Sequence, residues 1–137
     1  MTLLEKVMKA ERVFIIGNGG SWANAMHIAN DLLACGVPAF TLDPATLTAS
    51  ANDFGFETVF ARWLQTVGNE GDLLLALSGS GTSKNIVAAM ETAAAKGMQY
   101  HLVTHYLKER DMQESEQDQL ALGHELRAAL MRVRQCS

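Results

Sequence analysis

Residues Val13-Phe14-Ile15-Ile16-Gly17-Asn18-Gly19-Gly20-Ser21 form a short apolar run followed by a glycine-rich turn. A helical pattern continues from this turn to about Ala34. A buried strand, a glycine turn and a helix start form an anion site, because backbone N–H groups and the positive end of the helix dipole point at whatever occupies the turn. We expect Ser21 to cap the helix with its side-chain oxygen.

A second stretch repeats this layout. The apolar run 73–77 precedes Ser78-Gly79-Ser80-Gly81-Thr82-Ser83, and a helical pattern follows from about Asn85. Neither turn contains the lysine of a nucleoside-triphosphate loop, and Trp22 interrupts the dinucleotide pattern G-x-G-x-x-G. The hydroxyl groups and helix N–H groups suit a single phosphate monoester. The alternative is that both stretches are ordinary strand–helix turns in which serines only cap helices.

The order of the elements predicts an α/β fold. Strands are expected at 12–16, 39–42, 73–77 and 100–104, and helices at 2–10, 21–34, 44–51, 57–67, 83–96 and 116–134. Alternation of strands and helices indicates a parallel sheet with helices on both faces, within one domain of residues 1–137. Both glycine turns then fall at the carboxyl ends of strands, where such sheets bind ligands.

Local signals set some of the boundaries between these elements. We expect Asp43 and Pro44 to start the helix over 44–51 as its N-cap and first residue, and Asn52-Asp53-Phe54-Gly55 to break it. The polar residues 105–113 are expected to form a loop.

Composition excludes several classes of protein. The 137 residues are 48% hydrophobic and 19% charged, which is typical of a globular protein rather than a disordered chain. The net charge is -4 without a Lys/Arg cluster, so we expect no nucleic-acid partner. No apolar run approaches the roughly 20 residues of a membrane span, and residues 1–6 do not resemble a signal peptide. The two cysteines, Cys35 and Cys136, lie far apart, which favours a reduced, cytoplasmic location.

Two pairs of titratable residues could carry chemistry. His27 and Asp31 lie four residues apart on one predicted helix, and Glu116 and His124 lie eight apart on another, so each pair shares a helix face. Imidazole and carboxylate groups suit a zinc-class metal and could also act as general acid and base. The alternative is that His27 is a half-buried helix histidine paired with Asp31, and that Glu116 and His124 face solvent.

Four blocks of the sequence carry a resemblance to a known family. They are Phe14-Ile15-Ile16-Gly17-Asn18-Gly19-Gly20-Ser21 with Ala25, His27 and Asp31-Leu32; Ala51-Asn52-Asp53-Phe54-Gly55-Phe56 with Val59-Phe60-Ala61-Arg62; Gly71-Asp72 through Ser83 and Asn85; and Glu116, Leu120 and His124. In these blocks the chain resembles the sugar-isomerase (SIS) domain of the phosphoheptose isomerases.

The resemblance implies a three-layer, flavodoxin-like α/β sandwich. Since only 105–115 separate the fourth predicted strand from the last helix, we expect four strands instead of the family's five. It also implies a homo-oligomer, a tetramer or a dimer, whose pocket lies between subunits. The implied reaction is the aldose–ketose isomerisation of sedoheptulose 7-phosphate to a heptose 7-phosphate through an enediol.

The resemblance further implies roles for individual residues. Substrate contacts fall on Asn18, Gly19, Gly20, Ser21, Asn52, Asp53, Ser78, Gly79, Ser80, Ser83 and Glu116, with the serine-rich turn holding the phosphate. Zinc would be bound by His27, Asp31, Glu116 and His124, and Asp31 and His124 would move the proton.

Three residues depart from the family's pattern: Asp31 replaces Glu, Glu116 replaces Gln, and Gly79 replaces Thr. Together with the short C-terminal region, these departures keep a second hypothesis open, namely a non-catalytic SIS module that binds a sugar phosphate or a protein partner. A nicotinamide-dependent enzyme is a third hypothesis, for which Asp43 is the main signal.

Overall fold

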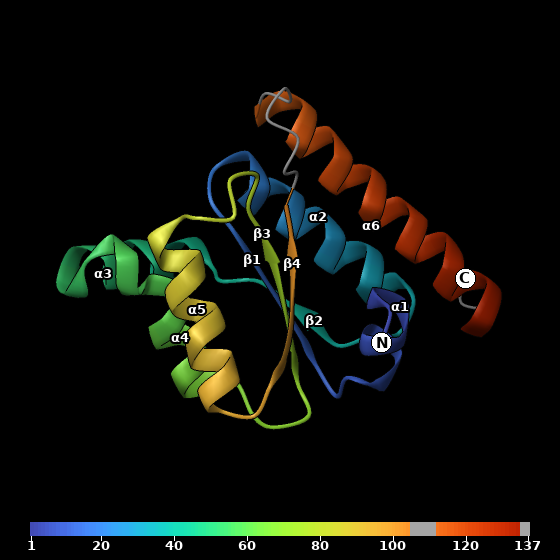
Figure 1. The fold of residues 1–137 in the computed structure, drawn as a ribbon, viewed down its shortest axis with the longest axis horizontal. Coiled ribbons are helices and arrows are strands. Elements are labelled where there is room, and N and C mark those ends of the chain that lie inside the picture. Colours follow the sequence, from blue (N-terminus) through green and yellow to red (C-terminus); the bar gives the residue numbers. More distant parts are fainter. Residues whose placement is uncertain (105–111, 135–137) are drawn as a thin grey trace.

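Four parallel strands form the centre of the fold (Figure 1). The computed structural model describes residues 1–104 and 112–134. Its strands are β1 (Val13–Gly17), β2 (Ala39–Phe40), β3 (Leu73–Leu77) and β4 (Gln99–Val103). Its helices are α1 (Leu3–Lys9), α2 (Gly20–Ala34), α3 (Pro44–Phe54), the 3-10 turn η1 (Phe56–Thr58), α4 (Val59–Val67), α5 (Lys84–Ala95) and α6 (Met112–Arg134).

The sheet has the strand order β2-β1-β3-β4, and every neighbouring pair is parallel. Val13 lies beside Ala39 on one side and beside Leu73 on the other, and Leu73 lies beside Gln99. After β1 the chain adds β2 along one edge of β1. After β2 it crosses back and adds β3 along the other edge of β1. The predicted parallel α/β sheet is therefore confirmed, with four strands in the part of the chain that the structure describes.

Helices cover both faces of the sheet, as predicted. On one face Ile15, Leu75 and Leu77 pack with buried residues of α2 and α6. On the other face Ile16 and Leu74 belong to a core that includes α4 and α5. Figure 1 shows α2 and α6 together on one side of the sheet and α4 and α5 on the other. Because β1 and β3 are buried on both faces, their sequences are continuous apolar runs.

The predicted start of α3 is confirmed. Asp43 is the N-cap, its Oδ1 accepts a hydrogen bond of 2.9 Å from the Thr46 N–H, and Pro44 is the first helical residue. Hydrogen bonds from the Thr46 backbone and side chain lower the pKa of the Asp43 carboxyl, because they stabilise its charged form.

The predicted end of α3 is wrong. Asn52 and Asp53 belong to the last turn of the helix, which ends at Phe54. Gly55 is its C-cap, where a φ of 98° suits glycine. The predicted loop 105–113 falls largely on residues 105–111, which lie outside the described residues. Its last two residues belong to α6, which therefore begins at Met112 and not at 116.

Helix α6 packs closely against α2 of its own chain. Gly123 makes this possible, because a Cβ at this position would lie only 2.6 Å from Ile28 Cγ1. Leu126 and Leu130 of α6 are buried in the same core as Ile28. Residues 119, 123, 126 and 130 follow the helical spacing of a face that packs on a neighbour. Among the helices of the described ranges, none combines the length and apolarity needed to cross a bilayer.

The close approach at Gly123 predicts the effect of one methyl group. We expect Gly123→Ala to lower the free energy of unfolding by about 1–3 kcal/mol, because the added Cβ overpacks against Ile28. Urea unfolding of Gly123→Ala measures this, with exposed Gln117→Ala as the control on the same helix. Helix propensity alone favours alanine over glycine by about 1 kcal/mol. A Gly123→Ala protein as stable as the wild type would therefore contradict the observed packing.

Candidate functional site

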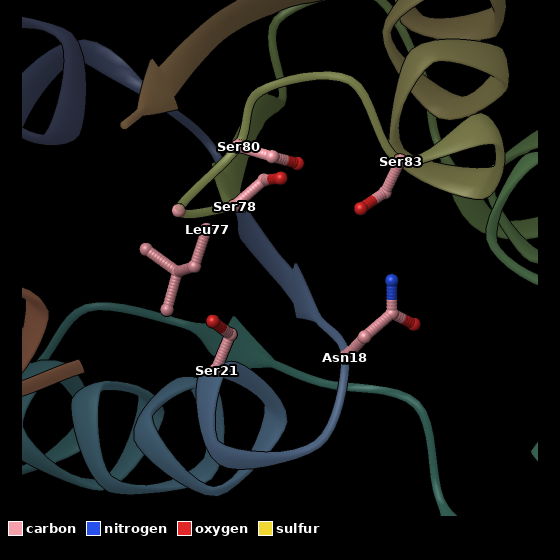
Figure 2. A pocket seen from close by; sticks show the side chains of 7 residues that line it. Asn18, Ser21, Leu77, Ser78, Ser80 and Ser83 are labelled. Carbon is pink, nitrogen blue, oxygen red and sulfur yellow. The ribbon is translucent and has the colours of Figure 1, made fainter. Parts of the chain in front are cut away.

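The two glycine turns meet at the carboxyl ends of the two central strands. Gly17 and Leu77 are register partners at the ends of β1 and β3, so Asn18 and Ser78 continue from neighbouring positions. The chain leaves these two strands toward opposite sides of the sheet, and such a switch point is where open α/β sheets bind ligands. A small pocket lies here, lined by Asn18, Ser21, Leu77, Ser78, Gly79, Ser80 and Ser83 (Figure 2).

The pocket is small and rich in hydroxyl groups. Its volume of about 40 Å³ exceeds the roughly 10–15 Å³ that one water requires, and it suits a group of phosphate size rather than a whole sugar phosphate. Ser78 Oγ accepts a hydrogen bond of 3.1 Å from the Gly81 N–H, and Ser80 Oγ accepts one of 3.2 Å from the Thr82 N–H. A hydroxyl that accepts in this way retains its own hydrogen to donate. The turn therefore offers donors to an acceptor such as a phosphate oxygen.

The serines of the pocket do not cap the helices, contrary to what we expected for Ser21. The N-cap of α2 is Gly19, with φ 57° and ψ -121°, so the helix begins at Gly20 and Ser21 already lies within its first turn. Ser21 Oγ instead accepts a hydrogen bond of 3.0 Å from Gln119 Nε2. Ser83 stands at the N-cap of α5 but makes no capping hydrogen bond to a described residue. The reading of both turns as mere serine caps is therefore not supported.

Asn18 connects the two turns. Asn18 Nδ2 donates to Asn85 Oδ1, and Asn85 Nδ2 donates back to Asn18 Oδ1, both at 2.9 Å. Asn85 is buried at the start of α5, so this reciprocal pair ties the turn before α2 to the turn before α5. Sequence reasoning included Asn85 in a family block but assigned it no role.

Glu116 lies beside the first glycine turn. A Cβ at Gly20 would overlap with the Glu116 carboxylate, so the carboxylate lies directly against the start of α2. The Glu116 backbone oxygen accepts a hydrogen bond of 2.7 Å from Asn24 Nδ2, which fixes this part of α6 on α2. Glu116 does not line the pocket between the two turns, so its contact with a ligand stays a prediction.

Two histidines and one aspartate form a compact group between α2 and α6. His27 Nε2 lies 3.1 Å from His124 Nε2 and 3.4 Å from Asp31 Oδ2. One ligand atom from each residue lies within 4.8 Å of the others. The resemblance had placed all three residues in one predicted zinc set, and in the structure they do lie together, although His124 lies 93 residues further along the chain than Asp31.

This group fits a zinc-class ion. With metal–ligand bonds of about 2.0–2.1 Å, tetrahedral geometry places neighbouring ligand atoms about 3.3 Å apart, close to the two spacings observed. Asp31 is 2% exposed, and its buried Oδ2 has no hydrogen-bond partner among the described residues. A buried carboxylate oxygen that makes no hydrogen bond to a described residue and lies 3.4 Å from His27 Nε2 is available as a metal ligand. Three protein ligands with an open fourth position are typical of a catalytic site.

The fourth member that we expected, Glu116, does not belong to this group. Arg127 lies beside it instead: Arg127 Nη1 donates a hydrogen bond of 2.8 Å to Asp31 Oδ1. The guanidinium orients the carboxylate and offsets its charge, which weakens the attraction of Asp31 for a cation. Sequence reasoning missed Arg127, although it lies three residues after His124 and therefore on the neighbouring helix face.

Asn52 and Asp53 lie apart from the pocket. Both are exposed in the last turn of α3, where Asn52 Nδ2 donates to Asp53 Oδ1 at 3.1 Å. Neither lines the pocket between the two glycine turns.

Comparison with known proteins agrees with this architecture. The model of the SIS domain family matches residues 2–104. A phosphoheptose isomerase from Edwardsiella ictaluri is 44% identical over 110 residues, which cover 74% of this chain and 57% of that protein. The chain thus spans little more than half the length of this relative, and 52% of a second one from Sodalis glossinidius, which is also 44% identical.

Solved structures extend the likeness over nearly the whole chain. A phosphoheptose isomerase from Francisella tularensis is 27% identical, with a TM-score of 0.85 over 94% of this chain and 82% of that chain. A phosphoheptose isomerase from Neisseria gonorrhoeae is 26% identical, with a TM-score of 0.83 over 93% of this chain and 80% of that chain.

The ion pair between Arg127 and Asp31 predicts a stability effect. We expect Arg127→Met to lower the free energy of unfolding by about 1–3 kcal/mol in the presence of a chelator, because it leaves a buried carboxylate without its charge partner. Adding Asp31→Asn should recover part of the loss. Urea unfolding measures both effects, with exposed Arg132→Met as the matched control. Equal stability of Arg127→Met and Arg132→Met would show that the pair is not formed.

Proposed function

The chain belongs to the SIS domain family, and on that basis we propose that it is an isomerase of sugar phosphates that converts an aldose phosphate into a ketose phosphate. The finer proposal is the interconversion of sedoheptulose 7-phosphate and a heptose 7-phosphate. The proposal rests on the position of two features along helix α2. A hydroxyl-lined pocket lies at the start of α2, and the group of His27, Asp31 and His124 lies further along the same helix, where α6 packs on it.

The spacing along α2 supports a long substrate. His27 follows Ser21 by six residues, about 9 Å along the helix axis. An extended seven-carbon phosphate has seven bonds between its phosphorus and C2, or roughly 8 Å at the per-bond rise of an extended chain. The axial rise from Ser21 to His27 is therefore similar to the length of the extended substrate, while the six residues also turn the two side chains about 120° apart around the helix.

The proposed substrate contacts divide between the phosphate and the sugar. Ser21, Ser78, Ser80 and Ser83, with the Gly79 backbone, hold the phosphate, and the turn at Asn18, Gly19 and Gly20 contacts the sugar together with Glu116. Because Asn52 and Asp53 do not line this pocket, we assign their contacts to the pocket of a neighbouring subunit in a homo-oligomer, a dimer or a tetramer.

The proposed chemistry is proton transfer through an enediol. Asp31 Oδ2 removes the proton from the carbon next to the carbonyl, while His124 protonates the carbonyl oxygen. Asp31 then returns the proton to the former carbonyl carbon, and His124 takes back a proton from the hydroxyl on the neighbouring carbon, which becomes the new carbonyl, so both residues end in their starting states. Arg127 holds Asp31 Oδ1, so Oδ2 is the oxygen that remains directed toward the two histidines. If His27, Asp31 and His124 held a zinc ion, the ion would supply a positive charge that stabilises the negative oxygen of the enediol. Asp31 Oδ2 and His124 Nε2 could transfer protons only while they were not bound to the ion.

We propose that residues 1–137 form one domain that functions in the cytoplasm.

Turnover of sedoheptulose 7-phosphate tests the proposed reaction. We expect His124→Ala to lower kcat by about 100-fold or more, because it removes one partner of the proton transfer. The matched control is His101→Gln on β4, where burial and the nearby Lys6 lower the histidine pKa and no proposed catalytic residue is involved. A folded wild-type protein that shows no turnover at any zinc concentration, but is stabilised by sugar phosphates, would favour the non-catalytic SIS module.

Metal content tests the proposed ligand set. We expect the wild-type protein to retain zinc after dialysis, and His27→Ala or His124→Ala to weaken zinc binding by about 100-fold or more, since changes of outer-shell partners alone cost about 10–100-fold. Glu116→Gln should bind zinc as well as the wild type, because Glu116 lies at Gly20 and outside the group. Loss of zinc in Glu116→Gln would contradict the three-ligand assignment.

A further inference from the structure

A buried glutamine on α6 contacts the pocket serine Ser21. Gln119 is 0% exposed, and its Nε2 donates a hydrogen bond of 3.0 Å to Ser21 Oγ. On its other side, Gln119 Oε1 accepts a hydrogen bond of 3.1 Å from Asn24 Nδ2. The sequence pattern did not indicate a role for Gln119 in the site, because its partners Ser21 and Asn24 lie almost a hundred positions away.

The direction of these hydrogen bonds is determined by a backbone group. Asn24 Nδ2 also donates to the Glu116 carbonyl oxygen at 2.7 Å, and a carbonyl can only accept. The amide nitrogen of Asn24 must therefore face α6, so the atom of Gln119 that faces Asn24 must be its oxygen. The Gln119 nitrogen then faces Ser21, and Ser21 Oγ must accept.

The consequence for Ser21 is that its own hydrogen is not used toward Gln119. Ser21 lines the pocket with Ser78 and Ser80, whose oxygens likewise accept from N–H groups of the protein. Figure 2 shows the Ser21 hydroxyl directed up from α2 toward the side of the pocket formed by Leu77 and Ser78. The difference is that Ser78 and Ser80 are held by their own turn, whereas Ser21 is held by α6.

We propose that Gln119 is a positioning residue that holds Ser21 as a hydrogen-bond donor toward a phosphate-type oxygen in the pocket. This inference rests on the proposed function, since it requires that the pocket binds the phosphate group. Through this contact the packing of α6 on α2 contributes to phosphate affinity, although α6 does not line the pocket. A hydrogen bond to a charged acceptor contributes about 10–100-fold in affinity, and that is the effect expected from losing the Ser21 donor.

The test is calorimetric titration of the full chain with inorganic phosphate and with sedoheptulose 7-phosphate. Gln119→Glu presents only acceptors to Ser21, so the serine hydrogen turns toward the carboxylate. We expect the Kd to rise at least about 10-fold. Gln119→Met keeps the volume and removes the hydrogen bond, and should give a smaller increase. Exposed Gln117→Glu, with the same charge change on the same helix, should bind as the wild type does.

A double-mutant comparison separates positioning from mere packing. In a Ser21→Ala background, Gln119→Met should cause no further increase in Kd, because its effect passes through the Ser21 hydroxyl. When the Gln119→Met single variant turns over the sugar phosphate, its KM should rise while its kcat changes less than about twofold. The reason is that the phosphate contact is equal in the ground and transition states. If Gln119→Glu does not fold, Gln119→Met and the double variant still decide.

The outcomes are distinguishable. Equal Kd values for the wild type and for both Gln119 variants overturn this inference and leave the proposed function in place. Additive effects of Ser21→Ala and Gln119→Met also overturn it. Failure of the wild-type protein to bind either phosphate compound overturns the proposed function, and this inference with it.

Discussion

The structure depends on the close packing of α6 against α2, which Gly123 permits by leaving room for Ile28. This contact brings together residues that are almost a hundred positions apart. It sets His124 beside His27, Arg127 beside Asp31, Gln119 beside Ser21 and the Glu116 carboxylate beside Gly20. A small shift of α6 along α2 would alter all four contacts at once, because a helix advances about 1.5 Å per residue.

This packing brings three of the predicted metal ligands together within the described part of one chain. The family's implied pocket lies between subunits, whereas here α6 reaches α2 within one chain, so His27, Asp31 and His124 come from the same molecule. Asp31 also pairs with Arg127, so it is not only a candidate metal ligand but also one half of an ion pair. This ion pair fixes one carboxylate oxygen and leaves the other directed toward the imidazoles, while the charge of Arg127 weakens the attraction of Asp31 for a cation.

Sequence patterns predicted the sheet, its four strands and the position of both glycine turns, because these features depend on local runs such as 73–77 and on short turns. The same reasoning gave Ser21 a wrong role and missed Arg127 and Gln119. These roles depend on the rotation and register with which α6 docks, which a helical pattern does not specify beyond its apolar face. The error at Asn52 arose because polar residues resemble a helix break, whereas the backbone turned only at Gly55.

We infer that His27, Asp31 and His124 of a single chain form one group that can bind a metal or transfer protons. An anomalous-difference map at the zinc edge, from crystals grown with zinc, tests it most directly. We expect an anomalous-difference peak for zinc next to His27 Nε2, Asp31 Oδ2 and His124 Nε2 of a single chain. A map without a peak at these atoms, or with zinc bound by His124 from one chain and His27 from another, would contradict it.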